Sequence, residues 1–374
     1  MIPSEFGVYL HVPWCRKLCP YCDFAVEVAP DERSVPHTEY LAAVLDELDR
    51  RADRFTGTLA SIYFGGGTPA LWRPDCLAQA VAAIVRRFGG TPREVTLEAN
   101  PTDCTDDNLA AWRAAGIDRI SIGVQSYEPS TLVTLGRDHR FGDGRAAIER
   151  ALAAGFIVCA DFITSVPGSA DEHAAIDTRP HHLSTYELTI EERTAFGKRV
   201  REGRLVPLDE DVTTERYVAT HDWLVAAGYE HYEISSYAKP GWRAVHNSLY
   251  WAGAAYLGLG VGAASLELLP DGSAIRQTHV RRWRDYQASR GEPAERLHVS
   301  ASEMAADRAW LGMRTADGVA EDALAPAPGV ADRLVADGLA VRRDGRICPT
   351  LRGFLMADRI AEQIVRAWRG PRIP

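Results

Sequence analysis

Six short apolar runs, each leading into polar or helix-forming sequence, constrain the fold of this 374-residue chain more than any other feature. The runs are 8–12, 61–64, 94–99, 119–124, 156–163 and 182–188, and helical periodicity follows at 37–52, 75–88, 105–115, 129–135 and 143–154. Repeated strand–helix steps imply parallel strands joined by crossovers, because parallel neighbours cannot be linked by a tight turn. We therefore predict an α/β fold, either a barrel or a doubly wound sheet.

Polar residues stand just after most of these runs. The groups are the first three cysteines, Gly65-Gly66-Gly67, Glu98-Ala99-Asn100-Pro101 and Gln125-Ser126. In a barrel the C-terminal ends of the strands form the active face, whereas an open sheet binds its ligand at one switch point. Polar groups after several strands favour the barrel-like arrangement.

The pattern changes near residue 213, where a helix leads into an aromatic, turn-rich segment and a glycine-rich run. After residue 300, two helical stretches flank Pro326 and Pro328. Residues 339–348 are then typical of a β-hairpin with an Asp-Gly turn, and a final helix is expected at 351–368. We expect a core barrel over 1–212, an extension over 213–299 and a smaller C-terminal α+β domain of winged-helix character over 300–374.

Composition and charge narrow the classes of function. The net charge of −9 argues against nucleic-acid binding, which needs a basic face. No run of about 18 apolar residues is present, so any membrane association is expected to be peripheral at most. The N-terminus does not resemble a signal peptide. Seven cysteines, an odd number, do not suggest a disulfide framework, and a reducing cytoplasm fits better.

Three of the cysteines, Cys15, Cys19 and Cys22, fall within eight residues. Three thiolates can bind three irons of a [4Fe–4S] cluster and leave the fourth iron open to a chelating molecule. A structural zinc site normally takes four ligands, and His11, the nearest candidate for the fourth, lies on the predicted strand. Unrelated thiols are the remaining alternative. The clustering favours a [4Fe–4S] site.

The Cys-x3-Cys-x2-Cys motif after a first strand resembles that of the radical S-adenosylmethionine (SAM) superfamily. Further motifs are similar to the oxygen-independent coproporphyrinogen oxidase group and, within it, to the HemW family of heme chaperones: YLHVPWC, YFGGGTP, EANP, ISIGVQS, LGRDH, LSTYELTIEERTAFGKR and HNSLYW. The resemblance runs from about Val8 to Ser265 and is weaker beyond. It implies a partial (β/α)6 TIM-like barrel that holds a [4Fe–4S] cluster, with SAM bound at the open iron.

The resemblance also implies which residues contact SAM. The loop Gly65–Pro69, with Gly66, Gly67 and Thr68, matches the loop that contacts the amino group of SAM, and glycines let the backbone approach a ligand closely. The other matched contacts are Tyr9, Tyr21, Glu98, Gln125, Arg137 and Asp161. Ordinary roles are the alternatives, such as a helix cap for Glu98 or a surface salt bridge for Arg137. The implied chemistry is reductive cleavage of SAM to methionine and a 5′-deoxyadenosyl radical, which needs an electron donor.

Two features separate the oxidases of this group from the HemW side. The oxidases carry a fourth cysteine two residues after the third and a longer N-terminal segment. Here Phe24 stands at that position, and only 14 residues precede Cys15. Both features are similar to HemW proteins, which bind heme and are thought to pass it to acceptor proteins. The resemblance therefore implies heme and a heme-acceptor protein as partners, with coproporphyrinogen oxidation disfavoured and no catalytic residue assigned.

His246 in the HNSLYW motif is the candidate heme ligand, because imidazole is a normal axial donor, and His231 is a weaker candidate. The alternative is an aromatic core in which His246 is only hydrogen-bonded.

Three short sequence segments depart from the family pattern. Ser165-Val166-Pro167 replaces Gly-Leu-Pro, Gly168-Ser169-Ala170-Asp171 stands where a glutamine is expected, and Ala264 replaces a histidine. These departures keep open a methyltransferase or cyclopropanase that uses two SAM molecules, as well as the oxidase itself.

Overall fold

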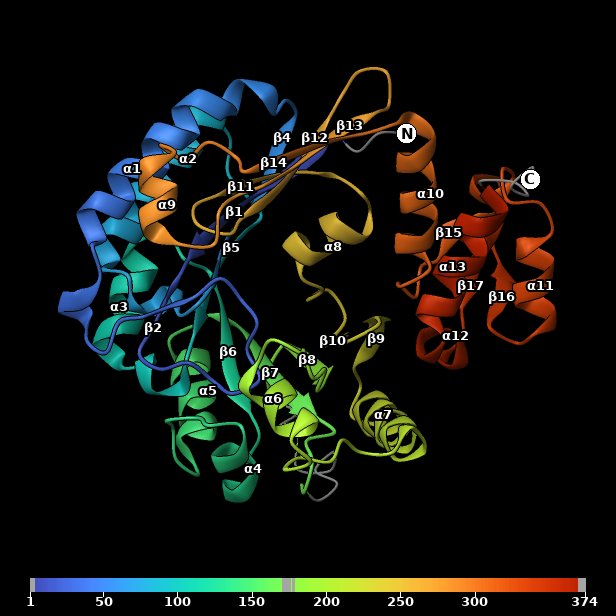
Figure 1. The fold of residues 1–374 in the computed structure, drawn as a ribbon, viewed down its shortest axis with the longest axis horizontal. Helices are drawn as coiled ribbons and strands as arrows, with labels where there is room; N and C mark the ends of the chain where they lie inside the picture. The colour runs from blue at the N-terminus through green and yellow to red at the C-terminus, as the bar shows by residue number, and fades with distance from the viewer. Residues whose placement is uncertain (1–3, 170–175, 177–178, 369–374) are drawn as a thin grey trace.

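The computed structural model describes residues 4–169, 176 and 179–368. Six parallel strands form the centre of a 12-stranded mixed sheet, in the order β1-β4-β5-β6-β7-β8 (Figure 1). They are β1 (Glu5–Val12), β4 (Thr58–Gly66), β5 (Glu94–Ala99), β6 (Arg119–Gln125), β7 (Ile157–Thr164) and β8 (His182–Glu187). These are the six apolar runs of the sequence. The α/β prediction is confirmed as a partial TIM-like barrel, since the two end strands of the sheet, β14 and β9, are not paired with each other.

The segment after residue 213 extends this sheet at both edges. Next to β1 lie β11 (Ala255–Leu259), which is parallel, and then the antiparallel strands β12 (Ala264–Leu268), β13 (Ala274–Thr278) and β14 (Glu295–Val299). Next to β8 lie the antiparallel strands β10 (Ser236–Ala238) and β9 (Glu230–Glu233). The barrel sheet and residues 230–299 therefore share one hydrogen-bonded framework.

Helices lie at the positions that the periodicity predicts: α1 (His37–Arg51), α2 (Pro74–Phe88), α3 (Asp106–Ala114), α4 (Pro129–Thr134), α5 (Asp143–Ala153) and α7 (Glu210–Ala226). The short helices α6 (Ala195–Arg201), α8 (Val245–Trp251) and α9 (Trp283–Ala288) were not predicted. The apolar face of α1, with Leu41, Val44 and Leu48, is buried in the main core together with Val8 and Leu10 of β1. Since side chains alternate along a strand, Tyr9 between them faces the other side of the sheet.

The C-terminal unit lies beside the barrel in Figure 1 and has a small apolar cluster of its own. It contains α10 (Ala301–Gly312), β15 (Val319–Ala320), α11 (Val330–Ala336), β16 (Ala340–Arg343), β17 (Arg346–Pro349), α12 (Leu351–Leu355) and α13 (Ala357–Trp368). The predicted hairpin is β16–β17, and its turn residues Asp344 and Gly345 both have positive φ, as a two-residue type I′ turn requires.

The single helix expected at 351–368 is wrong. It is two helices, because the backbone of Met356 (φ −108°, ψ 23°) leaves the helical region between α12 and α13. None of the described helices is both long and apolar enough to span a membrane.

Candidate functional site

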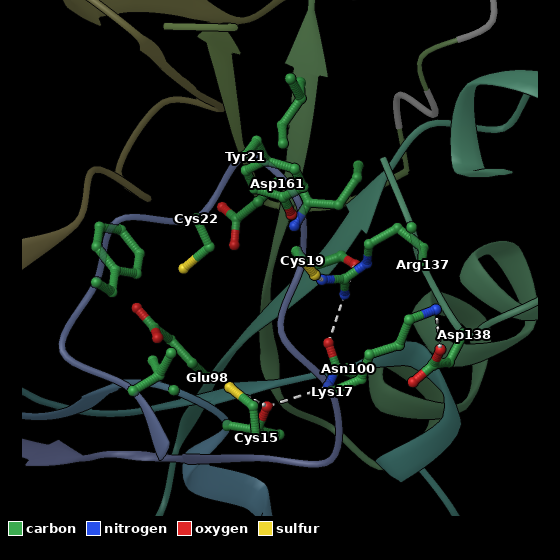
Figure 2. A pocket seen from close by; sticks show the side chains of 18 of the residues that line it. Cys15, Lys17, Cys19, Tyr21, Cys22, Glu98, Asn100, Arg137, Asp138 and Asp161 are labelled. Carbon is green, nitrogen blue, oxygen red and sulfur yellow. Dashed lines mark hydrogen bonds and ion pairs between the residues drawn. The ribbon is translucent and has the colours of Figure 1, made fainter. Parts of the chain in front are cut away.

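A cavity of about 630 Å³ lies at the C-terminal ends of the parallel strands. Figure 2 shows side chains that line it, with Glu98 between Cys15 and Cys22 and with Arg137 beside Cys19. Its lining includes all but one of the residues that the sequence associates with the cluster and SAM: Cys15, Cys19, Cys22, Tyr21, Gly66, Gly67, Thr68, Glu98, Gln125, Arg137 and Asp161. The exception is Tyr9, and His246, the heme candidate, does not line this cavity either.

The cysteine loop, residues 15–28, is closed at its base by a short parallel pair of strands, β2 (Trp14–Cys15) and β3 (Glu27–Val28). Two ion pairs tie the loop to other parts of the cavity wall, Arg16 to Asp103 at 2.6 Å and Lys17 to Asp138 at 3.2 Å. The carbonyl of Pro20 accepts a hydrogen bond from the amide of Phe196 at the start of α6. These contacts hold the cysteine loop, and with it the three thiols, against the C-terminal ends of the strands.

The three thiols are half-buried, and none is in a disulfide. Burial raises the pKa of Cys15 to about 11 and also raises the pKa of Cys22. Among the described residues no group of three or more His, Cys, Asp or Glu side chains is arranged to hold a metal ion. Three thiols around a cavity of this size are a donor set for a polynuclear cluster rather than for one ion, and binding would release the thiol protons.

In the loop Gly65–Pro69, the space available explains why glycine stands at positions 66 and 67. Gly66 has φ +113°, and a Cβ there would lie 2.6 Å from the His11 ring. A Cβ on Gly67 would lie 2.7 Å from the carbonyl oxygen of Trp14. Larger residues would push the loop away from the cysteine loop, so these glycines keep two walls of the cavity together.

Glu98, at the end of β5, accepts a hydrogen bond from the Tyr63 hydroxyl (2.8 Å) and one from the Gly66 amide (3.1 Å). Burial raises the pKa of Glu98 to about 7, and the nearby charge of Asp161 adds to this, while the two donors oppose it. None of its contacts among the described residues is a cation. A ligand ammonium group would provide the missing partner.

Arg137 crosses the cavity wall between the cysteines and the strand ends. Its guanidinium donates to the Asn100 side-chain oxygen, to the carbonyl of Gly123 (3.0 Å) and to the sulfur of Cys19 (3.7 Å). The Asn100 amide in turn donates to Thr68 (3.3 Å), whose hydroxyl lies 3.6 Å from the Cys15 sulfur as donor. Asn100 thus links two thiols through their neighbours. Sequence reasoning quoted the EANP motif but did not single out this residue.

Gln125 and Asp161 line the cavity from β6 and β7. Gln125 has φ +67°, and the pairing of β6 with β7 shifts register between Gly123 and Gln125. This bulge turns the strand end toward the cavity. Asp161 accepts a 2.8 Å hydrogen bond from the Ser121 hydroxyl, and burial raises its pKa.

Tyr9 lines a second cavity of about 380 Å³, which borders the first and shares Phe24, Gly66 and Glu98 with it. The Tyr9 hydroxyl donates to Nδ1 of His11 (3.0 Å), since Nε2 of His11 donates to the carbonyl of Ala25 (2.9 Å). Both nitrogens of His11 are therefore engaged within the protein. A contact between Tyr9 and SAM remains a prediction.

His246 is buried on α8 and lines neither cavity. Its Nδ1 lies 2.8 Å from the Ser61 hydroxyl and its Nε2 lies 2.9 Å from the Tyr250 hydroxyl. Burial lowers the pKa of His246 to about 3. Heme ligation by His246 stays a prediction, and it would require the Nε2 or Nδ1 hydrogen bond to break. His231 is also engaged, with its Nδ1 2.9 Å from that of His221.

The structure describes the surroundings of two of the three departures from the family pattern. Ser165 has φ +59°, a left-handed conformation that favours the glycine usual there. Ala264 lines the second cavity. The third, Gly168–Asp171, falls partly outside the described residues, since Ala170 and Asp171 are not among them.

Comparisons with known proteins place this site in a context. The family model of the radical SAM superfamily matches residues 9–177. Heme chaperone HemW of Mycobacterium tuberculosis is 34% identical over 373 residues, covering 97% of this chain and 95% of the relative. Heme chaperone HemW of Escherichia coli is 36% identical over 293 residues, covering 76% of each. The solved structure of coproporphyrinogen III oxidase (HemN) from Escherichia coli matches 96% of this chain and 90% of its own, with a TM-score of 0.77 at 19% identity.

Proposed function

The chain belongs to the HemW family within the radical SAM superfamily, and from this premise we propose that it is a heme chaperone-like protein. Superfamily membership implies a [4Fe–4S] cluster and SAM. In the proposal, Cys15, Cys19 and Cys22 hold the cluster, SAM binds at its open iron, and heme is bound and delivered to an acceptor protein. Binding of the cluster and SAM is supported by one observation: the three thiols and the polar residues at the strand ends line the same cavity.

Different residues of the cavity are expected to bind different parts of the cluster and SAM. When bound, the cluster would supply an open iron for the amino and carboxylate groups of SAM and an electron for its reductive cleavage. Glu98 offers a negative charge beside the glycine loop, where the amino group of SAM is expected. Arg137 offers a fixed positive charge next to Cys19. Asp161 and Gln125, which also line the cavity, supply polar groups for the rest of SAM.

Phe24 supports a chaperone rather than an oxidase. Its ring is 69% exposed and borders both cavities. Leu18 on the same loop is 53% exposed and lines the main cavity. Exposed apolar side chains at the mouth of a binding site suit a flat apolar ligand that must be passed on to a partner. The heme-binding part also rests on the names of the relatives.

Anaerobic reconstitution tests the proposal. The purified chain is loaded with iron and sulfide, and we expect four irons per chain, saturable SAM binding and a Soret band on heme addition. Cys19→Ala should lose the cluster, whereas the matched control Cys348→Ala, at a buried cysteine in the C-terminal unit, should keep it.

Full 4Fe–4S absorbance in Cys19→Ala would refute the cluster assignment. Absence of a Soret band would refute the chaperone reading, and an unchanged heme spectrum in His246→Ala would exclude His246 as ligand.

A second candidate function is an enzyme that uses two SAM molecules for methylation or cyclopropanation. The specific observation in its favour is the second cavity, which adjoins the first at Gly66 and Glu98 and is lined by Ala264. Equilibrium dialysis with labelled SAM separates the two readings, because two bound equivalents per cluster favour the enzyme and one favours the chaperone.

A further inference from the structure

A line of buried polar side chains leads from Asp161 away from the cavity. Its first contact joins Oδ1 of Asp161 to Sγ of Cys159 at 3.4 Å. The thiol lies 2.9 Å from Nδ1 of His182, and Nε2 of His182 lies 2.7 Å from the Tyr232 hydroxyl. Cys159, His182 and Tyr232 are all at least 97% buried. None of the three lines the cavity.

The strand register produces this line. Cys159 and Asp161 are two residues apart on β7, so their side chains share one face of the strand. In the parallel ladders Cys159 pairs with His182 of β8, and Asp161 pairs with Ser184 one step nearer the strand ends. Because these positions belong to the sheet, the contacts are set by the barrel itself rather than by loops.

The direction of the hydrogen bonds follows from counting protons. The backbone amide of Ala244 donates to the Tyr232 hydroxyl (3.4 Å), so the hydroxyl's own proton is available for Nε2 of His182. The imidazole is neutral, since burial lowers the pKa of His182 far below its usual value. Its single proton then lies on Nδ1 and is donated to the sulfur. The Ser184 hydroxyl also lies 3.5 Å from the sulfur, but it donates to Asp161, so the thiol proton is directed to Oδ1 of Asp161.

The reverse direction is less well satisfied. If the thiol donated to Nδ1, then Nε2 would donate to the Tyr232 hydroxyl, which already receives the Ala244 amide. The hydroxyl proton would then need a new acceptor inside the core, and Asp161 would lose a donor. Unsatisfied buried donors are costly, so the first direction is favoured.

We infer that Tyr232, His182 and Cys159 are positioning residues that direct the thiol proton onto Asp161 and so hold its carboxylate ready for SAM. The inference rests on the proposed function, because it takes Asp161 as a SAM contact. The Tyr232 hydroxyl fixes which nitrogen of His182 carries the proton. His182 then donates to the sulfur of Cys159, so that the thiol donates its own proton to Asp161 and stabilises the ionised carboxylate.

Other groups also face Asp161 and bear on its titration. Burial raises the pKa of Asp161, while hydrogen bonds from Ser121 to its second oxygen and from Ser184 oppose this rise. Charged or ionisable groups from the neighbouring strands are Glu98 on β5, Tyr63 on β4, Arg119 on β6 and Tyr186 on β8. Substituting Tyr232 leaves all of these in place, so it isolates the effect of the thiol direction.

The test is SAM affinity of the cluster-loaded protein as a function of pH. A carboxylate that accepts from SAM loses affinity when protonated, so affinity should fall on the acid side. Cys159→Ala removes one donor to the carboxylate and should move this acid limb upward by about one pH unit. Tyr232→Phe should move it in the same direction although the thiol is retained. Cys159→Ser, which keeps a donor, should restore the parental limb.

Tyr237→Phe is the matched control, because Tyr237 is a buried tyrosine of β10 whose hydroxyl has no hydrogen-bond partner among the described residues. Its acid limb should equal that of the parental protein. Cluster content and urea midpoints confirm that each variant is folded, and if Cys159→Ala does not fold, Tyr232→Phe and Cys159→Ser still decide. An unshifted limb in Tyr232→Phe would overturn the inference.

An infrared measurement without SAM separates this inference from the proposed function. The S–H stretch of Cys159 is obtained as the difference between the parental protein and Cys159→Ser. We expect Tyr232→Phe to shift this band, and an unchanged band would overturn the inference whatever SAM does. Parental SAM affinity in Asp161→Asn would instead refute the SAM contact at Asp161, and with it the part of the proposed function on which the inference rests.

Discussion

Two carboxylates inside this protein, Glu47 on α1 and Glu98 at the end of β5, have opposite surroundings. Glu47 is fully buried, and its two oxygens receive Arg51, His279 (2.8 Å), the Tyr286 hydroxyl and the Gly260 amide (3.0 Å). Glu98 is partly exposed to the cavities it lines and receives only the Tyr63 hydroxyl and the Gly66 amide. One carboxylate has the Arg51 guanidinium among its partners, and the other has no cation among its described contacts.

The difference appears in the pKa values. Burial alone would raise the pKa of Glu47, yet hydrogen bonds and charge from His279 and Arg51 lower it below its usual value. The pKa of Glu98 is raised to about 7 by burial and by Asp161. A completed set of partners joins α1 to α9 and to the segments after β11 and β13, and it stabilises the fold. An incomplete set at a cavity marks a place for a ligand.

Breaking the completed set should have the largest effect. Arg51→Met leaves the Glu47 charge buried with fewer partners, and the free energy of unfolding should fall by about 3–5 kcal/mol in urea titrations. Arg50→Met is the matched control, since Arg50 pairs with Asp46 and Glu292 at the surface and should cost less than about 1 kcal/mol. Equal losses in the two variants would contradict the contrast.

Glu98 should affect stability in the opposite direction with pH. Its folded pKa lies above its unfolded value, so ionisation is penalised in the folded state and stability declines as pH rises from about 4.5 through 7. Glu98→Gln removes this loss and should be more stable than the parental apoprotein above pH 7 by roughly 1–3 kcal/mol. Urea midpoints at pH 5 and 8 measure it. Glu47→Gln should instead be destabilised at pH 8, since the pKa of Glu47 is lowered.

The same Glu98→Gln substitution should weaken the ligand. If the carboxylate accepts the ammonium group of SAM, loss of its charge should reduce SAM affinity about tenfold, measured by dialysis on the cluster-loaded protein. Parental affinity should also fall as pH drops below 7, and the variant should lose the part of this fall that Glu98 causes and keep the acid limb that belongs to Asp161. Unchanged affinity would place the amino group of SAM elsewhere.

The smallest expected effect concerns the backbone beside the cavity. Ser165, just after β7, is held at φ +59°, so Ser165→Gly should relieve strain and raise the free energy of unfolding by up to about 1 kcal/mol. Ser130→Gly inside α4 should lower it by a similar amount, because glycine is unfavourable in a helix. A loss of stability in Ser165→Gly would show that the serine side chain, rather than the backbone, governs this position.

Local patterns predicted much of the architecture. Each of the six central strands contains a short run rich in apolar, β-branched or aromatic residues, and the helices between them have a clear 3.6-residue period, so short windows suffice to recognise both. The strands outside the barrel, β9 to β14, were not predicted. They are short, and most of them, β11 excepted, mix polar with apolar residues and lie at or near an edge of the sheet.

The sequence by itself determined the chemistry available: three clustered thiols, a glycine loop and polar residues at the strand ends, recognisable because their spacing is local. Only the tertiary structure decided which groups are satisfied. It engaged both nitrogens of His246, placed Tyr9 at a second cavity, and brought Cys159, His182 and Tyr232 into one line behind Asp161. The physical reason is that hydrogen-bond partners and burial depend on strand register and on long-range packing, which no short window of sequence contains.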